Sequence, residues 1–274
     1  MTANVDHLTP VEKTLLVTLT GRALDARKNR ALLGDHLADT VSGRLVHDTV
    51  AVSDTVAIAV AVRSAMLDRL VGSFIAVHPD AVVVELGCGL ETRMHRIAPP
   101  ATVDWYDIDL NEVISLRRQV LPELNHSHLV AASLTDPGWL DTVPRDRRAI
   151  IVADGGLGFL TEADNRQILG TLTEHFTAGG ELVCNAYTRI AARMMGSMGV
   201  LRSVGIPKHY RGFGFDDPHV LERLNPRLVF VEEQLGAQAP ETARFPWHTR
   251  MIAKVFARWR AQARRGVWVL RYRF

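Results

Sequence analysis

Short apolar runs alternate with segments of helical periodicity from residue 80 onwards, and this alternation constrains the fold more than any other feature of the chain. The runs have the length of buried strands, whereas the segments between them place apolar residues three and four positions apart. The apolar runs are Ala81–Leu86, Thr102–Tyr106, Leu129–Ala132, Ala149–Val152 and Glu181–Cys184, and the helical segments are Thr92–Ile97, Leu110–Leu121, Trp139–Val143 and Glu162–Phe176. This order predicts βαβ units and a parallel sheet that binds ligands at the carboxyl ends of its strands.

The first sixty residues are predicted to be helical. Thr9 and Glu12 are spaced as a capping box, in which a threonine hydroxyl and a glutamate carboxylate satisfy free N–H groups at a helix start. A second helix is expected from Ser53 or Asp54 towards Ala76, where a His-Pro pair ends it.

The last ninety residues are mixed in character. Arg227–Glu233 and Val267–Phe274 predict two further strands, and Thr249–Arg264 predicts an amphipathic helix between them. The span 187–225 is rich in glycine, arginine, methionine and histidine and has no regular period. A loop-and-helix insertion is therefore expected in that span.

The composition is that of an ordinary globular protein and argues against several classes. A formal net charge of +2 over 274 residues favours neither a nucleic-acid protein nor a membrane-surface protein as a whole. Two cysteines make a disulfide framework implausible, and no Cys/His cluster has zinc spacing, so no metal is expected. The longest apolar stretch is broken by Arg63 and Ser64, and no secretion signal is evident, so we expect a cytoplasmic protein without a membrane span.

A glycine turn follows the first predicted strand of the alternating region. Gly87 and Gly89 stand between this strand and the next helix, where glycine lets the backbone approach a ligand closely. A dinucleotide-binding turn has a third glycine where this chain has Thr92, a position that lets a pyrophosphate sit on the helix N-terminus. The departure favours a smaller ligand such as S-adenosylmethionine. Glu85 agrees, because a carboxylate suits a cationic amine better than a phosphate.

An acidic residue stands at the end of the next predicted strand. Asp107 lies twenty residues after Gly87, where a carboxylate can accept hydrogen bonds from both hydroxyl groups of a ribose. The alternative is that Gly87 and Gly89 make a mere tight turn and Asp107 caps the following helix. The combination of strand, turn, spacing and acidic strand end favours the nucleotide-type site.

Several consecutive motifs in this region resemble the leucine carboxyl methyltransferase family. Within the family, the chain is most similar to the bacterial polyketide O-methyltransferase branch of the tetracenomycin-pathway type. The similarity is dense from about Arg63 to Cys184 and looser after that. The motifs are Gly87–Arg93, Asp104–Leu110, Leu116–Arg118 and Ala131–Leu140, followed by Phe215–Pro218 and Leu270–Phe274.

The resemblance implies an α/β fold of the class I methyltransferase, or Rossmann-like, type. It is a doubly wound, mostly parallel sheet of seven strands with the last strand antiparallel. The chain is then one domain with N-terminal helices and a lid insertion. Its expected parts are a helical cap (1–79), a cofactor-binding core (80–186), a substrate lid (187–225) and C-terminal strands with a helix (226–274).

The resemblance also assigns cofactor-binding roles to individual positions. Arg63 matches an arginine that pairs with the methionine carboxylate of the cofactor, although a salt-bridged helix arginine is the alternative. Asp107 and Asp109 match the acidic residues that hold the ribose, and Ser133 and Leu134 match positions that flank the adenine.

The run after the fourth predicted strand departs from the family pattern. The family usually has glutamate and a leucine- or methionine-rich run there, whereas this chain has Asp154 followed by three glycines within the run that ends at Leu160. The change leaves more room beside the sulfonium. We expect either an unusual substrate size or shape, or weakened catalysis.

The expected chemistry depends on the methyl acceptor. A carboxylate is ionised at neutral pH and needs no general base, so no catalytic residue is assigned. A phenol needs a base, for which His209, His219 and His248 are candidates, with surface or structural roles as the alternative.

The substrate pocket is expected in the irregular span Tyr187–Phe215. Tyr187 and Arg189 follow the fifth strand at the edge where α/β sheets bind ligands. Further candidates are Lys208, His209 and Arg211 for polar contacts, with Met194, Met195 and Met198 for an apolar wall. The alternative is a set of solvated cations and a packed methionine stripe.

The predicted C-terminal helix is basic. Its cations are Arg250, Lys254, Arg258, Arg260, Arg264 and Arg265, and its apolar face holds Ile252, Val255, Phe256 and Trp259. Such a helix can meet nucleic acid or an anionic membrane, but more often it docks on its own domain with a solvated polar face.

The leading hypothesis is an S-adenosylmethionine-dependent O-methyltransferase that acts on a carboxylate of a small polyketide-like natural product. The alternatives are a phenol O-methyltransferase, a protein C-terminal carboxyl methyltransferase, an RNA-modifying or RNA-binding protein, and a non-catalytic S-adenosylmethionine-binding protein. A small-molecule partner is expected, and nucleic acid is not. The sequence does not indicate an oligomeric state.

Overall fold

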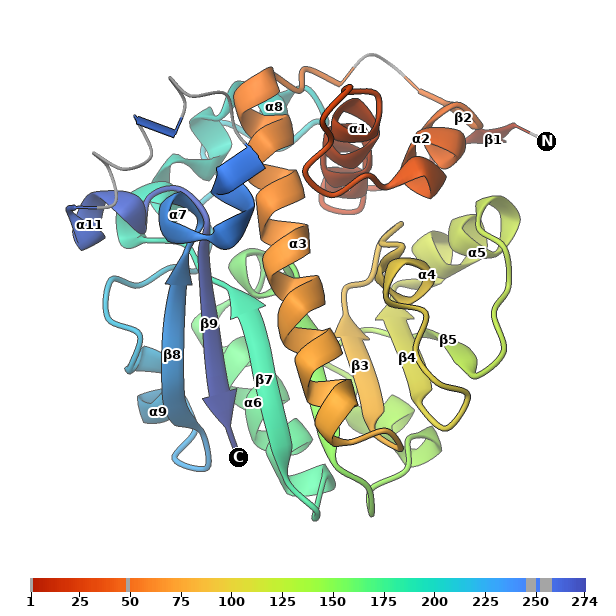
Figure 1. Ribbon diagram of the computed structural model, residues 1–274, viewed down its shortest axis with the longest axis vertical. Helices are drawn as coiled ribbons and strands as arrows, with labels where there is room; N and C mark the ends of the chain where they lie inside the picture. Colours follow the sequence, from red (N-terminus) through yellow and green to blue (C-terminus); the bar gives the residue numbers. More distant parts are fainter. Residues whose placement is uncertain (1, 48–49, 245–249, 252–257) are drawn as a thin grey trace.

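A seven-stranded sheet forms the centre of the computed structural model, which describes residues 2–47, 50–244, 250–251 and 258–274 (Figure 1). Its strands are β3 (Val82–Leu86), β4 (Asp104–Asp109), β5 (Ser127–Ala131), β6 (Ala149–Ala153), β7 (Gly180–Asn185), β8 (Val229–Leu235) and β9 (Trp268–Arg273). They follow the order β5-β4-β3-β6-β7-β9-β8, in which β9 runs antiparallel to both neighbours and β3 to β7 are parallel. The predicted fold class, with its antiparallel last strand, is confirmed.

Helices cover both faces of this sheet and its carboxyl edge. The longer ones are α1 (Thr14–Ala26), α2 (His36–Ser42), α3 (Asp54–Val77), α5 (Asn111–Val120) and α6 (Glu162–His175). The short ones are α4 (Arg93–Ile97), α7 (Arg189–Met194), α8 (Gly199–Arg202), α9 (Val220–Leu224) and α11 (Arg260–Ala263), with 3-10 turns η1 (Pro137–Thr142), η2 (Gly156–Phe159), η3 (Met195–Ser197), η4 (Gly236–Gln238) and η5 (Pro240–Arg244). A separate two-stranded parallel pair joins β1 (Ala3–Asn4) to β2 (Leu45–Val46).

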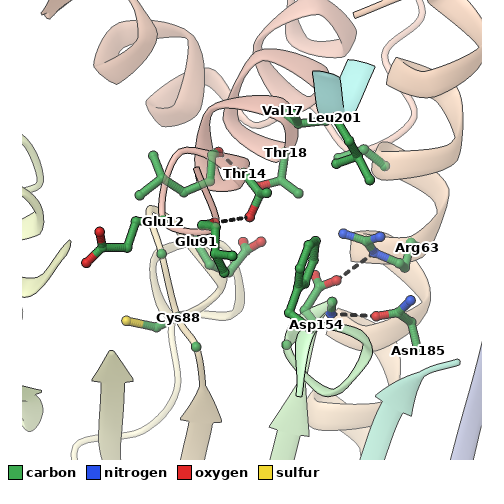
Figure 2. A pocket seen from close by; sticks show the side chains of 18 of the residues that line it. Glu12, Thr14, Val17, Thr18, Arg63, Cys88, Glu91, Asp154, Asn185 and Leu201 are labelled. Carbon is green, nitrogen blue, oxygen red and sulfur yellow. Dashed lines mark hydrogen bonds and ion pairs between the residues drawn. The ribbon is translucent and has the colours of Figure 1, made fainter. Parts of the chain in front are cut away.

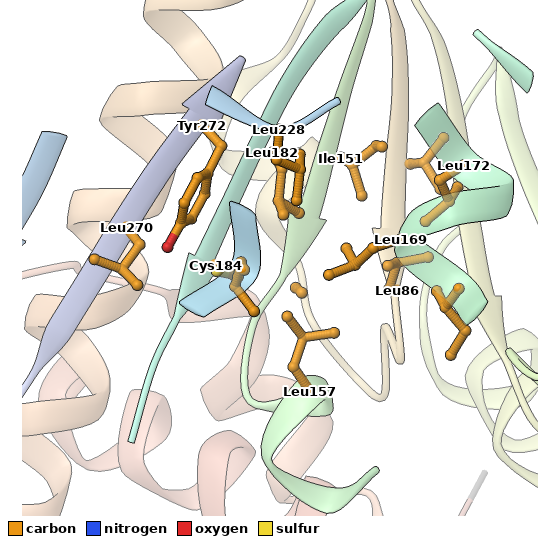
Figure 3. Close-up of a cluster of buried hydrophobic side chains, with 14 of the residues drawn as sticks. Leu86, Ile151, Leu157, Leu169, Leu172, Leu182, Cys184, Leu228, Leu270 and Tyr272 are labelled. Atoms are coloured by element: carbon orange, nitrogen blue, oxygen red, sulfur yellow. The ribbon is translucent and has the colours of Figure 1, made fainter. Parts of the chain in front are cut away.

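Alternate residues of β3 face opposite layers, as the two-residue period of a strand requires. Val82 and Val84 pack with Leu169 and Leu172 of α6, while Val83 packs with Leu67 of α3. Figure 1 shows α3 crossing one face of the sheet and α6 lying behind it. Figure 3 shows the α6 side of the core, where strand side chains meet those of α6.

The N-terminal helices lie over the carboxyl edge of the sheet. The predicted capping box is present, since the Thr9 N–H donates to Glu12 Oε2 at 2.7 Å, although regular α-helix begins only at α1. The helix α3 begins after Ser53, whose hydroxyl accepts the Val56 N–H. A Cβ at Gly21 would lie 3.0 Å from Val60 Cβ, so glycine lets α1 cross α3 closely. This crossing holds α1 above the strand ends.

Two predicted helices need correction. The segment predicted as the helix Trp139–Val143 lies largely in the 3-10 turn η1, which has only six residues. The helix Thr249–Arg264 is not continuous. Residues 245–249 and 252–257 lie outside the described residues, and Trp259 is extended with φ −114° and 63% exposed. Trp259 therefore does not dock an apolar helix face on the domain.

Candidate cofactor and substrate site

A cavity of about 580 Å³ opens at the carboxyl edge of the sheet. Small-molecule sites in proteins have volumes of about 300–1,000 Å³. Its floor is formed by the ends of β3, β4, β6 and β7, and its roof by α1, the start of α3 and residues 195–201. In Figure 2, α1 carries Thr14, Val17 and Thr18 over the cavity, opposite Glu91 and Asp154. The cavity therefore lies where the topology predicts a ligand.

The glycine turn after β3 forms part of the floor. Gly87 and Gly89 have φ of +65° and +50°, a left-handed backbone that glycine adopts without strain. The Gly89 N–H donates to Asp109 Oδ2 at 2.7 Å, and the Leu110 N–H donates to Asp109 Oδ1 at 2.8 Å. Asp109 thus fixes the turn and lines the cavity beside it.

Asp107 lies in a different environment from the one predicted. It is 1% exposed, and its Oδ2 accepts from Arg117 Nη2 at 2.6 Å. Among the described residues, the cavity lining includes Asp109 and not Asp107. The reason is position along β4, because Asp109 is the last residue at the strand edge and Asp107 is covered by Arg117. The geometry therefore favours Asp109 over Asp107 as the ribose carboxylate, a role that stays a prediction.

Arg63 and Asp154 contact each other where they line the cavity (Figure 2). Arg63 Nε lies 2.6 Å from Asp154 Oδ1, yet the angle is not that of a hydrogen bond, so both atoms are buried polar atoms without such a bond in the described structure. Burial lowers the pKa of Arg63, but the charges of Asp154, Tyr187 and Glu91 together outweigh it, and the net shift of the pKa is upward. Such a pair suits an amino acid, because the guanidinium can bind its carboxylate and the aspartate can bind its amine.

A buried ionic network that the sequence did not reveal surrounds this pair. Arg93 is fully buried and binds Glu85, Asp68 at 2.5 Å and Asp154 at 3.0 Å. Arg22 of α1 binds Glu91 at 2.6 Å and reaches the Leu90 carbonyl. The only sequence signal for Arg22 was its place beside the apolar positions Leu19 and Ala23 of the same helix. The network joins α1 and α3 to the segment that follows the glycine turn.

Glu85 lines the cavity and accepts from Arg93 Nε at 3.2 Å through both oxygens. Its burial, together with the charges of Glu91, Asp107 and Asp154, raises its pKa from 4.5 to about 8 despite Arg93. The carboxyl group is therefore largely protonated at neutral pH in the free protein.

The raised pKa of Glu85 predicts a pH-dependent stability difference. The protonated Glu85 carboxyl makes its full contribution to the free energy of unfolding below about pH 4.5. This contribution is lost as the pH rises from there to about 8. Relative to Glu85→Gln, which mimics the protonated form, the parent protein should lose up to about 1.4 kcal/mol per pH unit over this window. Urea unfolding of both proteins at pH 5, 6, 7 and 8 measures the difference. A difference that does not change with pH would show that Glu85 is ionised throughout.

The glycines after Asp154 accommodate protein groups. A Cβ at Gly158 would lie 2.5 Å from the Tyr187 ring, so the ring occupies the space that this glycine leaves. Tyr187 lines the cavity as predicted, and Asn185 holds the turn by accepting the Gly155 N–H at 2.5 Å. The expected extra room is therefore filled by Tyr187 at Gly158.

Replacement of Gly158 by alanine should displace Tyr187. We expect the overpacking to lower the free energy of unfolding by about 1–3 kcal/mol. Gly170→Ala is the matched control, because a Cβ there meets nothing within 4 Å in the interior of α6 and should stabilise by about 0.4–1 kcal/mol. Thermal unfolding of both variants checks the pair, and a neutral Gly158→Ala would contradict the packing.

Several predicted substrate residues lie away from the cavity. Arg189 is 63% exposed and pairs with Asp216 at 3.8 Å, and His209 is exposed on the surface. His219 is exposed beside Glu222. The structure thus places these three side chains at the surface, outside the cavity lining, and the geometry gives their predicted roles no support. Lys208, Arg211 and Met194 are exposed too, and His248 lies outside the described residues.

The remaining predicted residues border the cavity. Ser133 and Leu134 line it after β5, as do Met195 and Met198 of the insertion. Apolar residues missed in the sequence complete the roof: Val17, Val56, Ala59, Val60, Phe159 and Leu201. One end of the cavity is therefore ionic and the other is apolar.

The two cysteines lie in the described part of the chain and form no disulfide. Cys88 and Cys184 are buried free thiols, and burial raises the pKa of both. Within residues 2–47, 50–244, 250–251 and 258–274, no group of three His, Cys, Asp or Glu side chains is placed to hold a metal ion. None of the described helices is both long and apolar enough to cross a membrane.

Comparison with known proteins places the chain in a family. The leucine carboxyl methyltransferase family matches residues 16–173. The chain is 38% identical over 236 residues to the tetracenomycin polyketide synthesis O-methyltransferase TcmP of Streptomyces glaucescens, covering 85% of this chain and 86% of that protein. It is 30% identical to an S-adenosyl-L-methionine-dependent methyltransferase of Gibberella zeae, covering 82% of each.

Solved structures support the fold. A crystal structure assigned as a methyltransferase from Thermobifida fusca matches with a TM-score of 0.58 at 16% identity, covering 92% of this chain and 93% of that chain. The plantazolicin methyltransferase BamL, in complex with S-adenosylhomocysteine, matches with a TM-score of 0.51 at 10% identity, covering 96% and 97%.

The fold and the family matches define an enzyme of the class I methyltransferase type. The chain belongs to the leucine carboxyl methyltransferase family, which uses S-adenosylmethionine as methyl donor, and it is an O-methyltransferase of that family.

Proposed function

We propose that this enzyme methylates a carboxylate of a small, largely apolar, polyketide-like acid. The observation that carries the proposal is the division of the cavity, with ionic groups at the ends of β3 to β6 and apolar side chains under α1. Within the described residues, no histidine or lysine lines the cavity. A carboxylate acceptor needs no general base and fits such a lining, whereas a phenol is mostly protonated at neutral pH.

Named residues fit the cofactor. Arg63 would bind the methionine carboxylate, and Asp154 or Glu85 the amine. Asp109 would accept from the ribose hydroxyl groups at the end of β4, and Ser133 and Leu134 would flank the adenine after β5. When bound, S-adenosylmethionine supplies a methyl group that an ionised oxygen attacks in line with the sulfur. The order of these residues along the sheet leaves the β7 side of the cavity for the acceptor.

The protein's contribution to catalysis is then positioning and exclusion of water. Residues 187–225 would act as the substrate lid, since Tyr187, Met195 and Met198 of this span cover the cavity together with α1. Methionine side chains adapt to irregular apolar shapes, which suits a polycyclic acceptor. Tyr187, packed against Gly158, would form a rigid wall beside the acceptor.

Paired acceptors test this proposal. The purified enzyme is incubated with labelled S-adenosylmethionine and with 2-naphthoate, anthracene-2-carboxylate, 2-naphthol or 2-anthrol. We expect methyl transfer to the acids and at most slow transfer to the phenols, with a product that mild base hydrolyses because it is an ester. A base-stable ether from the phenols alone would contradict the carboxylate assignment. Methylation only of peptides ending in a free carboxylate would favour a protein substrate.

A further inference from the structure

A third arginine lines the cavity, at the end away from the glycine turn. Arg265 follows α11 and reaches the cavity together with Gly266 and Val267, just before β9. Because β9 is antiparallel to β7, the start of β9 lies beside the end of β7, where Asn185 pairs with Val269. A residue far along the chain thereby reaches the acceptor side of the site.

Arg265 differs from the other two arginines of the cavity because it has no ionic partner among the described residues. Arg22 binds Asp35 and Glu91, and Arg63 binds Asp154. In the described structure, the exposed side chain of Arg265 makes neither an ion pair nor a hydrogen bond. Its charge is therefore available to a ligand.

The backbone beside Arg265 is held in place. The Arg265 N–H donates to the Gln262 carbonyl at 3.0 Å, and the Gly236 N–H donates to the Val267 carbonyl at 2.8 Å. The preceding arginine, Arg264, is committed elsewhere, since it binds Glu233 at 2.8 Å. A fixed backbone with a free guanidinium is suited to recognise an anion.

The charges of the cavity are distributed unevenly along it. Its acidic side chains lie at the cofactor end, on or after β3, β4 and β6 and at the start of α1: Glu12, Glu85, Glu91, Asp109 and Asp154. The start of β9 is two strands beyond the end of β6, which corresponds to about 10 Å along the sheet edge. An acceptor with one end at the methyl group and an anion at the other would match this distribution.

We propose that Arg265 binds an anionic group of the acceptor that lies at the opposite end from the oxygen that is methylated. This inference rests on the carboxylate-methylation function proposed above and narrows its substrate class to acids with a second anionic group about two fused rings away. Arg265 is a positioning residue in this proposal, since the reacting atoms lie at the other end of the acceptor.

Naphthalene-2,6-dicarboxylate tests the proposal because it can be methylated twice, and the acceptors of the two steps differ by one remote negative charge. The first methylation leaves a carboxylate for Arg265, and the second starts from the monoester, which has no remote anion. We expect the parent enzyme to favour the first step about tenfold in kcat/KM and to accumulate monoester. Arg265→Gln should remove the preference, and Arg265→Lys should retain part of it.

Controls separate this role from folding and from the proposed function. Arg193→Gln, an exposed arginine of α7 outside the cavity lining, should leave the preference unchanged. Affinity for S-adenosylhomocysteine should be the same in all variants. If 2-naphthoate is methylated but the parent enzyme shows no preference for the diacid, or if Arg265→Gln keeps it, the role of Arg265 is refuted. If neither acid is methylated, both the carboxylate function and this role fail.

Discussion

Arg93→Ala is expected to lower the free energy of unfolding by about 3–5 kcal/mol, the largest stability effect predicted for this protein. Arg93 is 1% exposed and is shared by carboxylates from three parts of the fold: Glu85 on β3, Asp68 on α3 and Asp154 after β6. Without the guanidinium, Asp68 and Asp154 must stay charged in a largely buried site or take up protons, and Glu85 loses its hydrogen-bond donor. Equilibrium urea unfolding monitored by circular dichroism measures the loss.

The control for Arg93 is an arginine whose ion pair is exposed. Arg166 pairs with Glu162 at 3.6 Å on the surface of α6, with 55% and 63% of the two side chains exposed. Such pairs contribute little, so Arg166→Ala should change stability by less than about 0.5 kcal/mol. If Arg93→Ala cost no more than this control, the buried network would not hold the helices to the glycine turn.

Arg63→Ala is expected to weaken S-adenosylhomocysteine binding about 100-fold. Loss of one partner from a buried charge pair costs about 2–5 kcal/mol, and every 1.4 kcal/mol is about tenfold in affinity. Asp154 keeps Arg93 as a partner at 3.0 Å, so the variant should remain folded. Isothermal calorimetry measures the affinity, and circular dichroism checks the fold.

Arg69 provides the matched control on the same helix. It lies on α3, binds Glu241 at 3.3 Å and Gln234 at 3.1 Å, and is not part of the cavity lining in the described ranges. Arg69→Ala should therefore keep the parent affinity. If Arg69→Ala weakened S-adenosylhomocysteine binding as much as Arg63→Ala, the loss would come from a disturbance of the helix α3. It would not come from a lost contact between Arg63 and the ligand.

The sequence predicted the sheet well because its signals are local. Each strand from β3 to β7 overlaps an apolar run, and Gly87 and Gly89 adopt the positive φ that their place after a strand indicates. The strand boundaries moved by up to three residues, as at β4, which begins at Asp104 and ends at Asp109. The antiparallel β9 came from the family resemblance, since a periodicity does not fix strand direction.

The site was predicted less completely because side-chain direction depends on distant packing. Asp107 and Asp109 both match an acidic residue at the end of a strand. Only the structure shows that Arg117 covers Asp107 while Asp109 lines the cavity. Arg189 and His209 stand in an irregular span, where no period predicts which side chains face the cavity. The contribution of α1 was missed because its contacts join residues far apart in the sequence, such as Arg22 with Glu91.

The pH dependence of methyl transfer tests the central claim most directly, that the acceptor is an ionised carboxylate held without a general base. With 2-naphthoate as acceptor, kcat/KM should stay constant within about twofold between pH 6 and 8, because a carboxylic acid with a pKa near 4 is ionised throughout. A rise of about tenfold per pH unit over the same range would show that a proton must be removed before transfer. That result would contradict transfer to a carboxylate without a general base, because 2-naphthoate itself carries no proton in this pH range.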